Sequence, residues 1–186
     1  EAQAERDPAS GQSGLDVEVS LPQAGLEEPG AVAEADLKTG SIALPPEYAI
    51  NPAVANGLSF CTAAAANLDS SAAAACPDSA KLGTVELASP LLSTPMTGSI
   101  YAAEPTGQAA PTTTIPIYIV AGADAVSLKL PSQLSADPAS GRLRASFGPV
   151  PQLPLSRIGL HFFGGERAPF VVASTCGGHP LEAELD

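Results

Sequence analysis

Short apolar segments separated by turn residues are the feature that most constrains the fold of this chain. Leu15, Val17, Val19 and Leu21 alternate with polar residues, which is the period-two pattern of a half-buried strand. No segment has sustained helical periodicity, and Pro, Gly and Asp stand between the segments. The predicted strands cover residues 15–21, 36–44, 82–88, 97–103, 115–121, 125–130, 142–147, 158–163 and 170–174.

This pattern predicts an all-β fold, an antiparallel β-sandwich with one or two short helical turns. Asn51 can cap a turn that begins at the next residue, and the alanines after Thr62 can form a second turn. The sequence Asp137-Pro138-Ala139-Ser140-Gly141 is expected to close a hairpin between the strands around it. The break in alternation at Gly40 predicts a bulge.

The domain organisation follows from where the apolar pattern begins. Residues 1–13 have no apolar periodicity and are expected to form a linker or an extended arm, which could add to a neighbouring sheet edge. Residues 14–186 are expected to form a single β-sandwich domain, alone or as one member of a tandem array. A core of this size can bury about 70% of the unfolded surface.

The charge of the chain argues against nucleic acid as a partner. The formal net charge is −12, and the eight Lys and Arg residues are scattered rather than clustered on one segment. Residues 1–47 hold ten of the twenty acidic residues, which is typical of a solvated face. No apolar run approaches the ~20 residues that span a bilayer, so no transmembrane segment is expected. The remaining partner class is protein, either a second copy or a neighbouring surface module.

Two cysteines bracket an interval made mostly of Ala and Ser. A disulfide between Cys61 and Cys76 would stabilise the fold by about 3 kcal/mol on the chain-entropy model. A zinc site is disfavoured because neither His161 nor His179 has zinc-like spacing to these cysteines. Cys176 is then left over, either free or paired outside the chain.

A wider set of short motifs follows one after another within residues 15–180. These motifs are Leu44-Pro45-Pro46-Glu47, Asn51-Pro52, Gly57-Leu58, Cys61-Thr62, Cys76-Pro77-Asp78-Ser79, Lys81-Leu82-Gly83-Thr84-Val85, Pro90-Leu91-Leu92, Gly98-Ser99-Ile100-Tyr101-Ala102-Ala103, Asp137-Pro138-Ala139-Ser140-Gly141, Pro151-Gln152-Leu153-Pro154, Phe162-Phe163-Gly164-Gly165, Ala168-Pro169 and Cys176-Gly177. Their combined order resembles the large uncharacterised secreted or cell-surface proteins of actinobacteria. The resemblance implies tandem β-rich modules in an oxidising compartment, extracellular or in the cell envelope, and no catalytic residues to carry over.

Neither a catalytic nor a metal site is expected from the sequence. No Gly-x-Ser-x-Gly elbow is present, and His161 lies in a predicted strand where it would face solvent. A pair of carboxylates facing each other across a groove would be the exception, because two acids suffice for glycoside cleavage. Asp69, Asp78, Asp124 and Asp137 are more consistent with turn caps than with the dense ligand set of a calcium loop. No cofactor is expected.

These observations favour a non-enzymatic structural or adhesive module of a secreted or cell-surface protein. The alternative is a carbohydrate- or ligand-binding β-sandwich module, for which Tyr48, Tyr101 and Tyr118 are the tyrosines available to stack on a sugar. The alternative gains support if these three rings meet in one exposed groove. A hydrolase is the third class, and it lacks a motif.

Overall fold

The computed structural model describes residues 2–6, 11–28, 30–32, 34–55, 57–105, 114–123, 125–173 and 181–186. Within these residues every pair of neighbouring strands in the sheet is antiparallel, so the all-β antiparallel prediction is confirmed. The strands are β1 (Ala2–Arg6), β2 (Gln12–Ser20), β3 (Gly40–Ala43), β4 (Tyr48–Ile50), β5 (Lys81–Ala88), β6 (Met96–Ala102), β7 (Thr114–Ala123), β8 (Val126–Ala136), β9 (Leu143–Phe147), β10 (Arg157–Phe162), β11 (Phe170–Val172) and β12 (Glu182–Leu185). The helical elements are α1 (Ala24–Glu27), η1 (Pro52–Ala55), α2 (Ala63–Ala66), η2 (Asp78–Ala80) and η3 (Gly165–Arg167).

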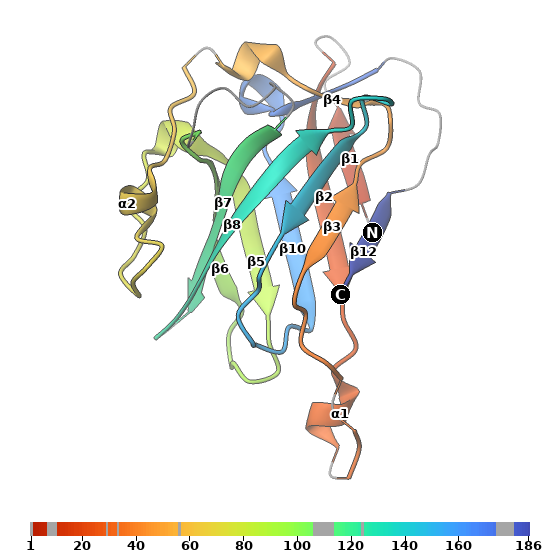
Figure 1. The fold of residues 1–186 in the computed structure, drawn as a ribbon, viewed down its shortest axis with the longest axis vertical. Helices are drawn as coiled ribbons and strands as arrows, with labels where there is room; N and C mark the ends of the chain where they lie inside the picture. The colour runs from red at the N-terminus through yellow and green to blue at the C-terminus, as the bar shows by residue number, and fades with distance from the viewer. Residues whose placement is uncertain are drawn as a thin grey trace.

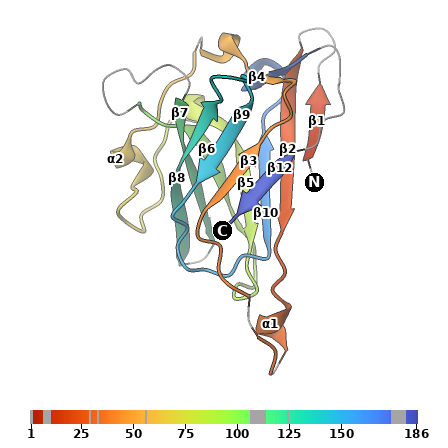
Figure 2. The ribbon, with the colours of Figure 1, turned by 45° about the vertical axis from the view of Figure 1, so that its right-hand side comes forward.

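The described strands form one continuous sheet that curls around a single core. Its order is β12-β3-β9-β8-β7-β6-β5-β10-β2-β11-β4, and β1 pairs with β2 outside this order. The curl brings β2, β10 and β5 opposite β3, β9 and β8 (Figure 1 and Figure 2). The two layers expected of a sandwich are therefore two halves of the same sheet.

Alternation along each strand decides which side chains enter the core. On β10, Ile158, Leu160 and Phe162 are buried, whereas Arg157 and His161 point to the outer face. The Phe162 ring meets the ring of Phe170 edge to face, with centroids 5.1 Å apart. This packing fixes the outward direction of the polar residues on the same strands, because a slip of one residue would exchange the two faces.

The local structure agrees with the sequence in several places. Leu134 pairs with Ala145 and Ala136 with Leu143, which confirms the hairpin around residues 137–141. Asn51 accepts a hydrogen bond from the Ala53 amide at the start of η1, which confirms the capped turn.

Two expectations about the N-terminal strands differ from the structure. The bulge predicted at Gly40 is wrong: β3 begins there, its register with β9 is unbroken, and a side chain at Gly40 would collide with the ring of Phe147. The first core strand starts at Gln12 rather than Leu15, and residues 2–6 of the expected arm pair with it as β1. The question of whether the arm contributes to stability stays a prediction.

Candidate functional site: a charged groove beside the disulfide lobe

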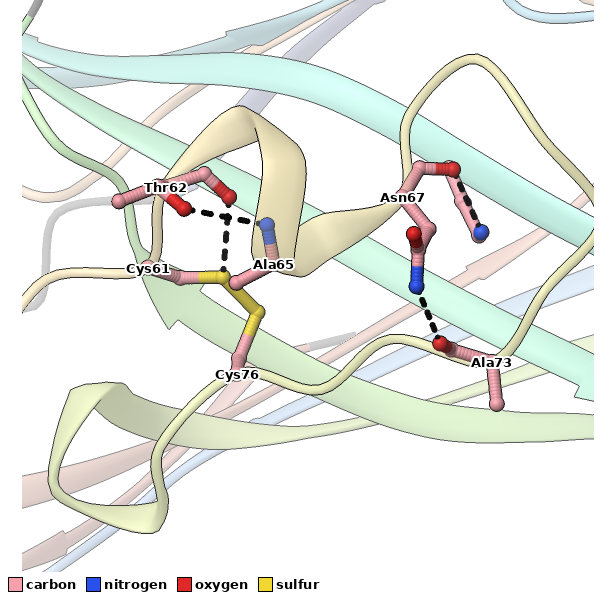
Figure 3. Close-up of a disulfide and its surroundings, with 7 residues drawn as sticks. Cys61, Thr62, Ala65, Asn67, Ala73 and Cys76 are labelled. Carbon is pink, nitrogen blue, oxygen red and sulfur yellow. Dashed lines mark hydrogen bonds between the residues drawn. A yellow bond between two sulfur atoms is a disulfide. The ribbon is translucent and has the colours of Figure 1, made fainter.

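The disulfide predicted between Cys61 and Cys76 is present, with the two Cα atoms 5.1 Å apart. We call residues 61–76 the disulfide lobe (Figure 3). Cys61 is fully buried, and its backbone joins the outer part of the sheet: its amide donates to the Ala102 carbonyl at 2.8 Å, and its carbonyl accepts from the Glu104 amide at 2.9 Å. The disulfide therefore ties the end of the lobe to a residue already held by the sheet.

The lobe contains little apolar bulk, so hydrogen bonds define its shape. The Thr62 hydroxyl accepts from the Ala65 amide at 3.0 Å and caps α2, which confirms a helical turn in the alanines after Thr62. Asn67 ends the helix in the left-handed region, and its side-chain amide donates to the Ala73 carbonyl at 2.7 Å (Figure 3).

A single lysine from the sheet holds the middle of the lobe. The Lys129 ammonium on β8 donates to the carbonyl oxygens of Asn67 at 2.8 Å and Ser70 at 2.9 Å, and to a third carbonyl, that of Ala72. Three carbonyl dipoles thus converge on one cation, an arrangement in which hydrogen bonds are stronger than between neutral partners. The lobe is fastened to the outer face at two places, the disulfide and Lys129.

The three candidate tyrosines do not meet in one groove. Tyr101 and Tyr118 are cross-strand neighbours on β6 and β7, and both pack with the disulfide lobe in a small apolar cluster on the outer face. Tyr118 is buried and Tyr101 is half-buried. Tyr48 lies in the main core, where its ring packs edge to face against Phe170 with centroids 6.2 Å apart. Tyr101 lines a groove between the lobe and β6–β8.

A second groove, of about 720 Å³, lies on the outer face of β2, β10, β5 and β6. Its centre is Gly159, which stands opposite Glu18 on β2 and Glu86 on β5. Because Gly159 has no side chain, these two acidic residues flank an open position on the middle strand. We call this the Gly159 groove. It shares Thr97 and Gly98 with the groove beside Tyr101, so the two hollows adjoin.

Charged side chains pair along the Gly159 groove. Arg157 binds Glu86, and it lies 3.6 Å from Glu18. On the other side of Gly159, the His161 Nδ1 atom lies 2.5 Å from a carboxylate oxygen of Asp16. These side chains are between 43% and 54% exposed. Three carboxylates and one guanidinium make the groove acidic whether or not His161 carries a proton.

Gly159 is not required by the backbone or by packing. A Cβ atom at this position would meet the Glu86 carbonyl at 3.6 Å and the Glu86 Cβ at 3.9 Å, which are ordinary contacts. In contrast, a Cβ at Gly83 or Gly98 would collide with the carbonyl oxygen of His161 or Val120. Glycine inside a strand costs about 0.5–1 kcal/mol relative to alanine. The open position at residue 159 therefore reduces stability without a structural need.

Sequence reasoning located only part of this groove. It placed Asp16 and Glu18 on the polar face of their strand and predicted that His161 faces solvent, and the structure confirms that exposure. It did not single out Glu86, Arg157 or Gly159. The sequence does carry one signal for this groove: Arg157, Gly159 and His161 alternate with apolar residues in a predicted strand, so all three should face outward. Which residues stand beside them depends on how this strand pairs with its two neighbours, and the sequence does not show that pairing.

Of the acidic residues expected to cap turns, Asp137 does so, whereas Asp78 pairs with a residue far along the chain. A carboxylate oxygen of Asp137 accepts from the amides of Ala139 and Ser140 and from the Ser140 hydroxyl. The Ser140 hydroxyl is the main reason that the pKa of Asp137 lies below its usual value. Asp78 pairs with Arg167, whose guanidinium also stacks over the Phe163 ring at 4.8 Å. Within the described ranges, no group of three or more His, Cys, Asp or Glu side chains is placed to hold a metal ion.

Asp124, Cys176 and His179 lie outside the described residues. No helix in the described part of the chain has the length and apolar character needed to cross a membrane. No known family model matches the chain, and comparisons with curated proteins and with solved structures found no match.

Proposed function

We propose that this chain is a non-enzymatic structural or adhesive module of a secreted or cell-envelope protein, and that the Gly159 groove is its contact surface. The observation that carries the proposal is the open position at Gly159 between Glu18 and Glu86, where a side chain would fit and would favour the strand. Glycine at residue 159 lowers the stability of the fold, and the proposal explains its presence by the room that it leaves for part of a bound partner.

The charged side chains around Gly159 are better suited to binding a partner than to stabilising the fold. Exposed ion pairs contribute only about 0–1 kcal/mol to stability, so the pairs of Arg157 and His161 add little to the fold. Charges held on adjacent strands can instead steer a complementary partner and set its orientation. Since carboxylates outnumber the guanidinium, the partner surface is expected to be basic or rich in hydrogen-bond donors.

The disulfide supports an oxidising location. The lobe has few large apolar side chains, and a cross-link of this kind persists outside the reducing cytosol. Lysing cells directly into denaturant that contains an alkylating reagent tests this point, because unfolding exposes the buried Cys61. Cys61 and Cys76 are expected to resist alkylation until a reductant is added, whereas labelling without a reductant would place the chain in a reducing compartment.

The proposed absence of catalysis rests on how the facing carboxylates are engaged. Glu18 and Glu86 stand on either side of Gly159, so they are a facing pair of carboxylates of the kind that could cleave a glycoside. Both of them, however, pair with Arg157. Neither is held as an isolated acid in an apolar pocket, which is the setting that prepares a carboxyl for proton donation.

A second candidate function is binding of a carbohydrate or another polar ligand across the two adjoining hollows. The half-buried Tyr101 ring at the wall beside the lobe favours it, because such a ring can pack against a sugar. The burial of Tyr48 and Tyr118 leaves this candidate with one of its three predicted rings. Loss of sugar binding in Tyr101→Ala, but not in Tyr48→Phe, would distinguish it from adhesion through charge.

Adhesion can be tested with beads coated with the chain and presented to cell envelopes of the organism that makes it. Adhesion is expected to weaken as salt rises, since exposed charges are screened over about 10 Å at 0.1 M. Reversing the groove with Glu18→Lys and Glu86→Lys together should reduce adhesion about tenfold or more, through slower association. Glu28→Lys, a reversal at an exposed residue just after α1, is the matched control and should have little effect. Equal adhesion of the groove reversal and the control would contradict the proposal.

A further inference from the structure

We propose that the interior of the curled sheet binds the end of a saturated hydrocarbon chain, at a site separate from the outer grooves. Between the two halves of the sheet lies a cavity of about 70 Å³, and no polar atom of the described residues faces it. Protein interiors rarely contain voids larger than a water molecule, whose share of liquid volume is about 30 Å³.

Small inward-facing residues on three strands create the cavity. Ala102 on β6, Ser132 on β8 and Ala145 on β9 line it. Ala102 and Ser132 stand on either side of Ile117 in the register of the sheet, so two of these small side chains flank one large one. The Ser132 hydroxyl donates to the Leu130 carbonyl, which satisfies its polarity within its own strand.

The opposite wall leaves this space unfilled. It consists of large side chains already packed in the main core, among them Leu15, Leu160 and Phe162. A second void of about 30 Å³ continues the gap along the core. The two voids share wall residues, namely Ile42, Ile119, Phe147 and Leu160. The core is thus underfilled along a line rather than at one isolated point, which suits a thin linear group.

The chemistry of the wall selects the ligand class. An apolar cavity without polar partners stays dry, and such cavities take up small apolar molecules. A volume of about 70 Å³ holds about two groups of the size of water. That is the end of an alkyl chain rather than an aromatic ring, because the apolar cavity known to take benzene is about 150 Å³.

Access to the cavity is suggested by uneven burial of its wall. Ile50, Leu58, Ile115 and Leu134 line the cavity but are only partly buried, whereas Ile42 and Ile117 are 3% and 5% exposed. The partly buried residues come from β4, β7, β8 and the segment after η1. A chain end can therefore enter where these side chains meet solvent, without opening the sheet.

The test is methyl NMR of the complete chain during titration with straight-chain alkanols of increasing length. Saturable shifts are expected at the methyl groups of Ala102, Ile117 and Leu15, and affinity should rise about fourfold for each of the first two or three methylenes. Longer alkanols should then gain less. A lysolipid with the same alkyl end, tested in parallel, shows whether the chain is taken from a lipid or only as a free small molecule. Either source supports the site.

Variants that fill the cavity give the second readout. Ala102→Val should abolish the shifts and raise the melting temperature, and Ala145→Val serves if the first variant does not fold. Ala49→Val makes the same change at an exposed position of β4 and should leave binding unchanged. If the unaltered chain gives no saturable shift, or if the filled variants bind as tightly as it does, the cavity is a packing void only and the proposal is wrong.

Discussion

Gly159→Val is expected to fill the proposed contact groove while the chain keeps its fold. The added Cβ meets only ordinary contacts with Glu86, at 3.6 and 3.9 Å, and the backbone at this position is not in the left-handed region. Replacing glycine in a strand interior gains about 0.5–1 kcal/mol, and a β-branched residue suits a pleated surface further. If the valine weakens the exposed ion pairs of Arg157, the free energy of unfolding falls by at most about 1 kcal/mol. We therefore expect the free energy of unfolding to stay equal or to rise by up to about 1 kcal/mol.

Urea unfolding followed by circular dichroism measures this effect. For a chain of 186 residues, 1 kcal/mol corresponds to about 2–4 °C in melting temperature. Gly98→Ala on β6, which is separated from β10 by β5, is the matched control, because the new Cβ there would collide with the Val120 carbonyl oxygen. This control should lose about 1–3 kcal/mol. If Gly159→Val loses as much free energy of unfolding as Gly98→Ala, the reasoning is refuted, because packing would then require glycine at residue 159.

Three further predictions concern the lobe and one turn. Replacing both Cys61 and Cys76 by Ser should cost about 3 kcal/mol and speed hydrogen exchange within residues 61–76; unchanged exchange would show that the disulfide does not hold the lobe. Lys129→Met leaves three carbonyl groups without their cation and should lower the free energy of unfolding by about 1–3 kcal/mol. Hydrogen exchange should become faster at the Asn67 and Ala73 ends of the loop. Lys38→Met, the control, should leave the lobe unaffected. The pKa of Asp137 is lowered in the folded state, so its contribution to stability is complete above the ordinary carboxyl pKa and is lost as the pH falls through the lower folded value. Ser140→Ala should raise that pKa in a carboxyl NMR titration, and an unchanged titration would contradict the assigned cause.

Much of the strand pattern could be predicted because it depends on local alternation. Leu15, Val17 and Val19 carry a period of two that does not need a partner strand to be recognised. The hairpin around residues 137–141 could be read because both of its strands adjoin the turn. In contrast, β12 has four exposed residues with alternating acids, and β4 has three residues, so neither carries enough apolar signal.

The candidate site could not be predicted because it depends on pairing between distant segments. Glu18, Gly159 and Glu86 form one row across the sheet, although they lie far apart in the sequence and on three strands that are not consecutive. The curl of one sheet, rather than the stacking of two, is likewise a long-range property. The disulfide could be predicted from the sequence because the interval between its cysteines is short and the Ala-rich lobe carries little apolar bulk.

The most direct test of the contact surface compares bead adhesion by the unaltered chain, Gly159→Val and Ala49→Val. Gly159→Val keeps every charge of the groove, and the folded chain is expected to keep its stability. The variant differs in that the valine side chain occupies the open position between Glu18 and Glu86. Ala49→Val adds a side chain of the same kind at an exposed position on β4. The account predicts that Gly159→Val, folded as well as the unaltered chain, loses adhesion to cell envelopes while Ala49→Val retains it. Full adhesion by a folded Gly159→Val would contradict the account.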